Sequence, residues 1–229
     1  MENYKLDFLK GVGLFSSLPE GELKGISDKI IMKEVRRGET ILNEEDTNRY
    51  MYIIVFGKVK VVKTTDDGRD TIIALHKSGE FFGEMSLLDG RTEPATVVAM
   101  EDSLVGLISK TNFHSLLHSQ EIFLDTFLLT LCSRLRDSWN KIQLLNFKYA
   151  SQRIRTLFRI LSETYGEKTA DGLSLKINLT HQDIADMTGL TRETTTRVLD
   201  RWQKDGDVAI LKKRGIRLSR DFLQKNDAV

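Results

Sequence analysis

The chain is 229 residues long, enough for two small domains with separate cores. Hydrophobic residues make up 40% and charged residues 29%, ordinary values for a globular protein, and the net charge is only +1. The lone cysteine, Cys132, excludes an intrachain disulfide and any all-cysteine iron–sulfur or zinc site within one chain. The first seven residues lack the apolar run of a signal peptide, and no stretch has the apolar length of a membrane span. We therefore expect a cytoplasmic protein.

The hydrophobic periodicity changes near residue 34. Up to about Lys33 the apolar residues follow helical spacings, and Leu23, Ile26 and Ile30 continue such a stripe. Residues 34–107 contain short β-type runs separated by glycine and aspartate, and Asp66-Asp67-Gly68 predicts a hairpin turn between two of them. Many short strands at this pitch indicate a sandwich or a barrel-like roll.

A long helix is predicted from about residue 120 to residue 146. Its apolar residues alternate spacings of four and three, which favours a two-stranded coiled coil and hence a dimer. The predicted seam consists of Leu124, Leu128, Leu131, Leu135, Ser138, Ile142 and Leu145. Packing of this stripe on the predicted strands is the alternative. Cys132 lies among these apolar residues and is predicted to be an inert core thiol.

Residues 179–199 predict two short helices joined by a tight turn at Gly189. Thr191 is a good N-cap for the second helix. This layout is typical of a helix-turn-helix, whose second helix enters the major groove of DNA. A helix over residues 153–161 and a short strand near residues 173–179 are predicted to precede it.

Two β-type runs, residues 208–211 and 216–218, predict a hairpin that makes the motif a winged helix. The hairpin tip carries three basic residues placed for phosphates, where they raise affinity without specifying sequence. These residues are Lys212, Lys213 and Arg214. Basic residues cluster in this half, whereas acids such as Glu44 and Asp66 crowd the first half, so a modest basic footprint is expected here.

The second helix of the motif begins with side chains that can read base edges. An arginine donates two hydrogen bonds to guanine, and a carboxylate accepts one from cytosine N4. Arg192, Glu193 and Arg197 are therefore the predicted base-reading residues. The predicted contacts to the DNA backbone, besides the hairpin tip, are Thr180, His181, Thr191, Thr194, Thr195 and Thr196. Helix-start amides favour a phosphate near the first two, and capping is the alternative role of the threonines.

In this order, the segments resemble the CRP/FNR family of bacterial transcription regulators. The resemblance rests on Gly57-Lys-Val-Lys-Val, on residues 79–90 and on the helix-turn-helix, and it covers nearly the whole chain. It implies an α+β fold with a cyclic-nucleotide-binding-type β-roll (jelly roll) over residues 1–118, a dimerisation helix over 119–147 and a winged helix-turn-helix over 148–229. It also implies a homodimer whose sensor domain controls two DNA readers, with palindromic double-stranded DNA and RNA polymerase as partners.

The pattern Arg-Glu-x-x-x-Arg in the second helix resembles the catabolite activator subgroup of this family. That resemblance implies a TGTGA-like half-site, repeated in a palindrome with half-sites about one helical turn, roughly 34–36 Å, apart. Thr196 occupies the place where the fumarate–nitrate subgroup carries serine, so a TTGAT-like variation stays open.

The resemblance also bears on the effector. In relatives that bind cyclic AMP, the phosphate is held after a Gly-Glu pair and by an Arg-Ser pair about ten residues later. Gly83 and Glu84 match the first pair, but Glu93-Pro94 stands in place of the second. A carboxylate repels a phosphate and proline lacks a backbone donor, so cyclic AMP is disfavoured. The candidate effector pocket comprises Gly83, Glu84, Met85, Ser86, Arg91 and Ser138, with Arg91 as a substitute cation.

Other triggers stay open: no effector at all, another small organic molecule, or haem and gas sensing. A haem or metal would use His76, or the pair His114 and His118 one helical turn apart, but ordinary surface histidines are expected and no metal site is predicted. The four-cysteine oxygen sensor of some relatives is excluded by the lone cysteine. The chain carries no nucleophile elbow, Walker loop or His-Glu-x-x-His motif, so no catalytic residues and no enzyme are expected.

Overall fold

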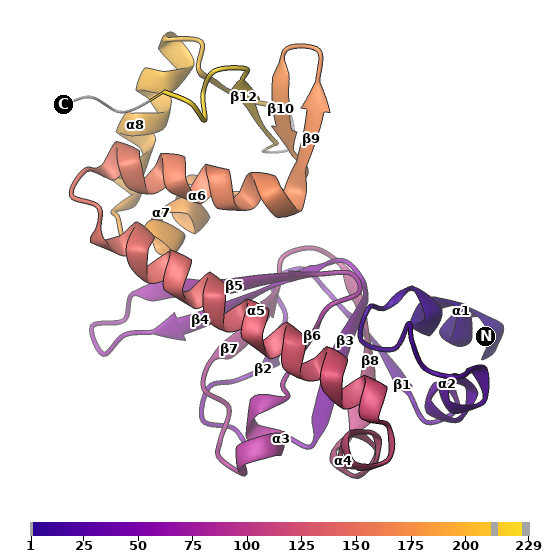
Figure 1. The fold of residues 1–229 in the computed structure, drawn as a ribbon. Coiled ribbons are helices and arrows are strands. Elements are labelled where there is room, and N and C mark those ends of the chain that lie inside the picture. Colours follow the sequence, from indigo (N-terminus) through magenta and orange to yellow (C-terminus); the bar gives the residue numbers. More distant parts are fainter. Residues whose placement is uncertain (1, 212–214, 226–229) are drawn as a thin grey trace. The chain divides into compact units, whose positions relative to one another are not determined.

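The computed structural model describes residues 2–211 and 215–225 (Figure 1). The chain divides into two compact units between Leu135 and Arg136. This division falls inside the long helix α5 (Glu121–Asn146), so one helix contributes residues to both units. The bounds of α5 agree with the helix predicted over residues 120–146.

The first unit is built around two four-stranded sheets (Figure 1). One sheet has the strand order β1-β8-β3-β6 and the other β2-β7-β4-β5, and all pairings are antiparallel. The strands are β1 (Ile31–Val35), β2 (Thr40–Leu42), β3 (Tyr50–Phe56), β4 (Lys58–Thr64), β5 (Asp70–Lys77), β6 (Phe81–Phe82), β7 (Thr96–Ala99) and β8 (Ser103–Ser109). The roll of short strands predicted for this part of the chain is thereby confirmed.

The predicted hairpin turn joins β4 to β5. The N–H of Thr65 donates to the Arg69 carbonyl at 2.9 Å, and the N–H of Gly68 donates to the Thr65 carbonyl at 2.8 Å. Gly68 has a φ of 78°, which glycine adopts without the Cβ clash of other residues. The Asp-Asp-Gly signal therefore set the turn, as predicted.

Aromatic residues pack the helices of the first unit onto its sheet. The Phe113 ring lies 5.5 Å from the Phe127 ring and 6.4 Å from the Phe123 ring, and Phe15 lies 5.4 Å from Phe123. All four side chains are fully buried. The helices are α1 (Glu2–Gly11), α2 (Glu20–Ser27), α3 (Met85–Asp89) and α4 (Lys110–Ser119). Phe123 and Phe127 lie on α5, so the first part of that helix is anchored in this core.

In the second unit, the end of α5 is followed by the helices α6, α7 and α8 and by a small sheet of order β11-β12-β10-β9. The elements are α6 (Ala150–Tyr165), β9 (Gly166–Thr169), β10 (Gly172–Leu175), α7 (His181–Thr188), α8 (Arg192–Lys204), β11 (Val208–Ile210) and β12 (Ile216–Ser219). Phe158, Trp202 and Phe222 form an aromatic cluster at its core, with the Trp202 and Phe222 rings 5.0 Å apart. The antiparallel β11–β12 pair completes the predicted winged helix-turn-helix.

The strand predicted over residues 173–179 is shorter than expected, since β10 ends at Leu175. The basic hairpin tip, residues 212–214, lies outside the described residues. In the described part of the chain, none of the helices has the length and apolar character needed to cross a membrane.

The aromatic core predicts a large difference between two identical substitutions. Phe113→Ala should lower the free energy of unfolding by about 3–5 kcal/mol, because it leaves a cavity among buried rings. Phe56→Ala should cost less than about 1 kcal/mol, because the Phe56 side chain is 63% exposed. Urea unfolding followed by circular dichroism measures both, and equal losses would contradict the assignment of this core.

Candidate DNA interface and sensor site

The first helix of the helix-turn-helix begins with a capping box. The Thr180 hydroxyl accepts from the Asp183 N–H at 2.9 Å, and the Asp183 carboxylate accepts from the Thr180 N–H at 2.9 Å. The helix ends at Gly189, which is left-handed with φ 64° and ψ 32°. A Cβ on Gly189 would lie 3.3 Å from Leu145 Cδ2, so close packing also favours glycine at the turn. The predicted turn at Gly189 is confirmed.

The second helix, α8, separates an inward face from an outward face. Thr191 caps it by accepting from the Thr194 N–H at 3.1 Å. The inward face is buried and consists of Thr195, Leu199 and Trp202. The predicted base-reading residues Arg192, Glu193 and Arg197 are all exposed. Arg197 Nη2 and Glu193 Oε1 are 4.0 Å apart, with side chains 70% and 82% exposed, so this surface pair leaves both groups accessible.

Two of the predicted backbone contacts have other roles in the structure. Thr195 was predicted to contact DNA, and this prediction is wrong, because its side chain is fully buried. It lies one turn before Leu199 on the inward face, and its hydroxyl has no hydrogen-bond partner among the described residues. The Thr180 hydroxyl serves the capping box and also donates to the Asp183 carboxylate at 2.7 Å. Capping is therefore its main role.

The remaining backbone candidates lie around the start of α7 and α8. His181 Nδ1 and the Thr196 hydroxyl lie 2.8 Å apart, which links the two helices of the motif. The Thr191 hydroxyl donates to the Thr194 hydroxyl at 2.9 Å. These four side chains are exposed or half-buried, so each of them reaches the surface of the helix-turn-helix.

Sequence reasoning missed Arg153, which fastens the motif to the preceding segment. Its Nε donates to the Phe147 carbonyl at 2.8 Å, and its Nη1 donates to the Thr188 carbonyl at 3.3 Å. The side chain thereby joins the segment between α5 and α6 to the last residue of α7. No local pattern predicts such a contact, because Arg153 and Thr188 are far apart in the sequence.

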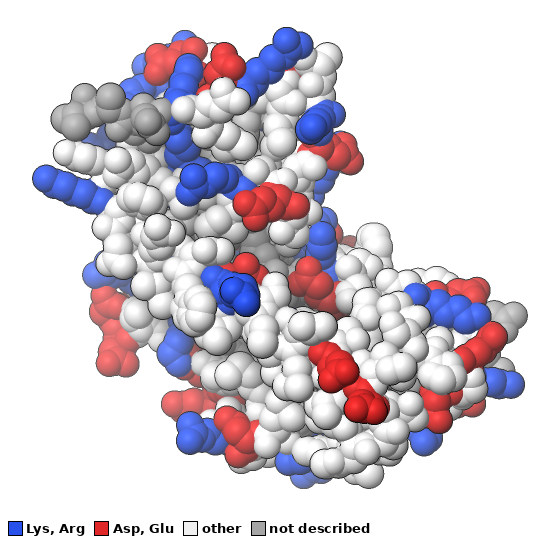
Figure 2. Space-filling model, viewed as in Figure 1, with Lys and Arg blue, Asp and Glu red and all other residues white. Residues whose placement is uncertain are grey.

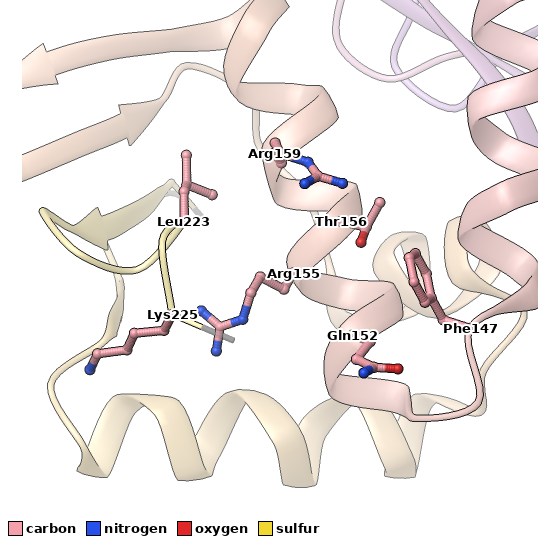
Figure 3. A pocket seen from close by; sticks show the side chains of 7 residues that line it. All are labelled: Phe147, Gln152, Arg155, Thr156, Arg159, Leu223 and Lys225. Carbon is pink, nitrogen blue, oxygen red and sulfur yellow. The ribbon is translucent and has the colours of Figure 1, made fainter. Parts of the chain in front are cut away.

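A small pocket of about 220 Å³ also lies in the second unit (Figure 3). Its lining residues are Phe147, Gln152, Arg155, Thr156, Arg159, Leu223 and Lys225. Figure 3 shows Arg155 reaching from α6 toward the segment that carries Leu223 and Lys225. The Arg155 guanidinium lies over the Phe222 ring at 4.2 Å and donates to the Phe222 carbonyl, and Lys225 pairs with Asp207 at 2.5 Å. Arg155 therefore fastens the C-terminal segment to α6, and Lys225 fastens it to the turn between α8 and β11.

Charges of both signs are mixed over both units on the face drawn in Figure 2. Residues 136–229 nevertheless carry 18 Lys and Arg against 12 Asp and Glu, whereas the rest of the chain has an excess of acids. The second unit therefore has a modest net positive charge, as its sequence suggests.

In the first unit, buried polar residues gather around α3. Glu84, Ser86 and Glu93 are each only 4% exposed. Glu84 Oε1 pairs with Arg134 Nη1 of α5 at 2.8 Å. Arg134 also donates to the Phe81 carbonyl, and its guanidinium lies 4.3 Å from the centre of the Phe81 ring. We call Glu84, Ser86, Glu93 and Arg134 the sensor cluster.

The second contact of the sensor cluster joins Ser86 to Glu93. The Ser86 hydroxyl donates to Glu93 Oε1 at 2.5 Å. Burial raises the pKa of the Tyr52 phenol, and the negative charge of Glu93 raises that pKa further. Because burial also disfavours the charged form of a phenol, Tyr52 stays neutral at ordinary pH.

A tight backbone approach closes the other side of this region. Gly83 has a φ of 78°, and a Cβ there would lie 3.0 Å from both Asn48 Nδ2 and Tyr52 Cδ2. Asn48 Nδ2 donates to the Gly83 carbonyl at 2.9 Å. Only a glycine fits this position without displacing its neighbours.

The predicted effector-pocket residues do not all lie together in the structure. Glu84 and Ser86 lie in the sensor cluster, whereas Met85 is 52% exposed. Arg91 was proposed as a substitute cation, but its side chain is exposed and lies 3.9 Å from Asp89, so it does not join the cluster. Arg134 is the cation there, and sequence reasoning missed it. Ser138 belongs to the second unit and is exposed.

The histidines considered for haem or metal have protein partners. His76 was expected at the surface, but it is buried, and its Nδ1 lies 2.9 Å from Glu80 Oε2. His114 Nε2 lies 3.0 Å from the Leu87 carbonyl, and the His114 and His118 rings stack at 6.2 Å. Across the described residues, His, Cys, Asp and Glu do not form any group of three or more suited to a metal.

The exposed apolar residues of α5 define a stripe that differs slightly from the predicted seam. Leu128, Leu135 and Ile142 are exposed, as a partner-facing seam requires, whereas Leu131 is half-buried against the first core. Cys132 and Trp139 are also exposed, and residues 128, 132, 135, 139 and 142 alternate spacings of four and three. We call these five residues the α5 stripe. The prediction that Cys132 is a core thiol is wrong, since it lies on the uncovered face of the helix.

The fold and the two sites define a class of protein. A β-roll is joined by a long helix to a winged helix-turn-helix whose predicted base-reading side chains are exposed. The family model described as "Cyclic nucleotide-binding domain" matches residues 32–120, and the model described as "Crp-like helix-turn-helix domain" matches residues 152–224. The chain belongs to the CRP/FNR family of DNA-binding transcription regulators.

Individual relatives agree with this assignment. The chain is 28% identical to the "Cyclic AMP receptor protein" of Thermus thermophilus over 88% of this chain and 90% of the relative. It is 28% identical to the "Global nitrogen regulator" of Synechococcus elongatus over 88% of this chain and 89% of that relative. The solved structure of FixK2 from Bradyrhizobium japonicum matches with a TM-score of 0.75 and 25% identity, covering 87% of this chain and 98% of that one.

The capping box predicts a stability effect that depends on one hydroxyl. Thr180→Val keeps the shape of the side chain but removes the cap, and it should lower the free energy of unfolding by about 0.5–2 kcal/mol. Thr180→Ser should retain most of the stability, because serine supplies the same oxygen. Thermal unfolding of the two variants and of the unchanged chain provides the comparison, and equal stability of the valine and serine variants would disprove the cap.

Proposed function

We propose that this regulator is a homodimer that binds a palindromic DNA site and couples DNA binding to the state of its sensor domain. The observation that carries this proposal is the arrangement of α8. Three long side chains, Arg192, Glu193 and Arg197, are exposed on α8. The protein itself caps this helix and buries its inward face. Such a helix can present them to base edges without losing packing.

The proposed half-site is TGTGA-like. The two guanidinium groups suit guanine, and the carboxylate between them suits cytosine on the opposite strand. Thr196 is half-buried and bonded to His181, which supports a role in the motif's own structure over a role in base reading. This favours TGTGA over the TTGAT-like variation. The exposed hydroxyls near the start of α8 and the basic hairpin tip would hold the DNA backbone.

The proposed dimer forms through the α5 stripe. Its leucine, isoleucine and tryptophan members are 50–58% exposed in the single chain. Burial of these side chains against a second copy would remove apolar area from water, and the spacing matches a two-stranded coiled coil. A twofold pair of readers then binds a twofold DNA site.

The proposed mechanism is a population shift. The dimer would exchange between arrangements in which the two readers do or do not match the half-site spacing, and the sensor domain would bias this exchange through α5. Arg153 supports the coupling, because it ties the segment after α5 to the end of α7. RNA polymerase is the proposed downstream partner, and the protein would act by binding rather than by catalysis.

We propose that cyclic AMP is not the effector, although one relative is named for binding it. The side chain at position 93 is a buried carboxylate bonded to Ser86, in the place where those relatives carry a phosphate-binding arginine. A regulator that binds DNA without an effector is therefore the second candidate. A haem sensor has less support, since the Nδ1 nitrogen of His76 is already paired with Glu80.

Replacement of Arg192 by alanine tests base reading. If Arg192 contacts guanine, Arg192→Ala should reduce discrimination at one base position by about 1–3 kcal/mol and leave the other positions unchanged. Lys204→Ala is the control, because Lys204 is exposed at the far end of α8. Selection of bound DNA from a random pool, followed by titration of single-base variants, measures both. A uniform loss across all sequences would show that Arg192 contacts only the backbone.

Charge placed on the α5 stripe tests the dimer. Leu135→Asp should weaken dimerisation by about tenfold or more, because it would bury an unpaired carboxylate between two helices. Asn140→Asp adds the same charge at an exposed position on another side of α5 and should leave the dimer intact. Analytical ultracentrifugation over a range of concentrations measures the dimer dissociation constant. A dimer that survives Leu135→Asp would place the interface elsewhere.

A further inference from the structure

Glu93 is the member of the sensor cluster whose burial most needs an explanation. A carboxylate withdrawn from water is costly unless hydrogen-bond donors or a cation compensate it. Arg134 compensates Glu84 at 2.8 Å, but Glu93 forms no ion pair within the described residues. Its partner is the Ser86 hydroxyl, at 2.5 Å. The Ser86 hydroxyl is therefore the one side-chain donor seen on this buried carboxylate in the described part of the chain.

The backbone delivers Glu93 to this position. The Glu93 N–H donates to the Asp46 carbonyl at 3.0 Å, and the Glu93 carbonyl accepts from the Glu45 N–H at 2.9 Å. Lys63 donates to the carbonyl of the next residue, Pro94, at 3.2 Å. The segment is therefore fastened on both sides of Glu93, so its carboxylate is presented to Ser86 without the entropy cost that a separate ligand would pay.

We propose that the sensor domain carries its own anion: the Glu93 carboxylate permanently fills a site for a small carboxylate or phosphate group beside Ser86. The domain then keeps the arrangement that an anionic effector would otherwise induce. The effect of this site on DNA binding rests on the function proposed above. The filling of the site by Glu93 is independent of that function.

The occupied site has a direct connection to α5. Ser86 follows Glu84 by two residues, and Arg134 binds both the Glu84 carboxylate and the Phe81 carbonyl. Loss of the Glu93 contact would free the start of α3, and Arg134 would pass that change to α5. An effector signal needs such a link between the site and the dimer helix. Here the chain itself supplies the anion, Glu93, and the contact to α5, Arg134.

Chemical rescue tests the proposal on the full-length protein. Glu93→Ala removes a group of the size of acetate, so the variant should unfold at a lower temperature, and added sodium acetate should restore its stability in a saturable way. Sodium chloride at equal ionic strength should not. The unchanged chain should show no specific acetate response, because its site is filled. Glu101→Ala, which loses the surface ion pair with Lys58, is the control and should not respond either.

A second variant separates the site from general stabilisation by acetate. In Glu93→Ala combined with Ser86→Ala, the anion has lost its hydroxyl donor, and the acetate response should disappear. If Glu93→Ala does not fold, Glu93→Gln takes its place with a different readout. Glutamine keeps the shape and removes the charge but leaves no room for acetate, so this variant should unfold at a lower temperature than the unchanged chain without an acetate response, and an equal or higher unfolding temperature would overturn the proposal. A saturable acetate response that is present in the double variant, or absent from Glu93→Ala, would overturn the proposal.

DNA binding provides the functional readout. Glu93→Ala should bind the selected palindrome about 5- to 150-fold more weakly without acetate, and acetate should restore the affinity. Glu93→Gln should also bind more weakly, and unchanged binding by Glu93→Gln would show that the charge is not needed. If the unchanged chain binds no palindrome, the proposed function fails, but the thermal rescue still decides whether Glu93 fills an anion site. Specific binding of cyclic AMP to the unchanged chain would contradict the filled site.

Discussion

The structure depends on α5, which packs into a hydrophobic core on one side and leaves apolar side chains exposed on another. The first turns of α5 bury Phe123 and Phe127 in the first unit, and Arg134 adds an ion pair to Glu84 there. Farther along, the α5 stripe leaves large apolar side chains in water. These two demands are compatible only because the helix keeps one phase over 26 residues, so each face has a fixed set of side chains.

The helix-turn-helix could be predicted from the sequence because its signals are local. Thr180 and Asp183 form the capping box three residues apart, and the left-handed Gly189 ends the helix they begin. The wrong predictions concern neighbouring positions on a helix, where a shift of one residue changes the face on which a side chain lies. Thr195 lies between half-buried neighbours in the sequence, and the helical phase turns it fully inward. In the same way Cys132 is exposed while Leu131 packs against the core.

The sensor cluster could be predicted only in part, because its contacts join distant segments. The Gly83-Glu84 pair was found from its resemblance to a family motif. The pairing of Glu84 with Arg134 spans 50 residues, and no periodicity or motif indicates it. The replacement at Glu93 was visible in the sequence as a departure from that motif. Its contact with Ser86 required the fold, since residues 84–93 have to turn back before the two side chains meet.

The two faces of α8 have a consequence for how such a regulator can change. Leu199 and Trp202 hold the helix in the core, whereas Arg192, Glu193 and Arg197 contribute almost nothing to that packing. Substitutions at these three positions can therefore change the chemistry of the exposed face without threatening the fold. If these side chains read bases as proposed, a change of target site needs only new surface chemistry, because the buried face of α8 stays as it is.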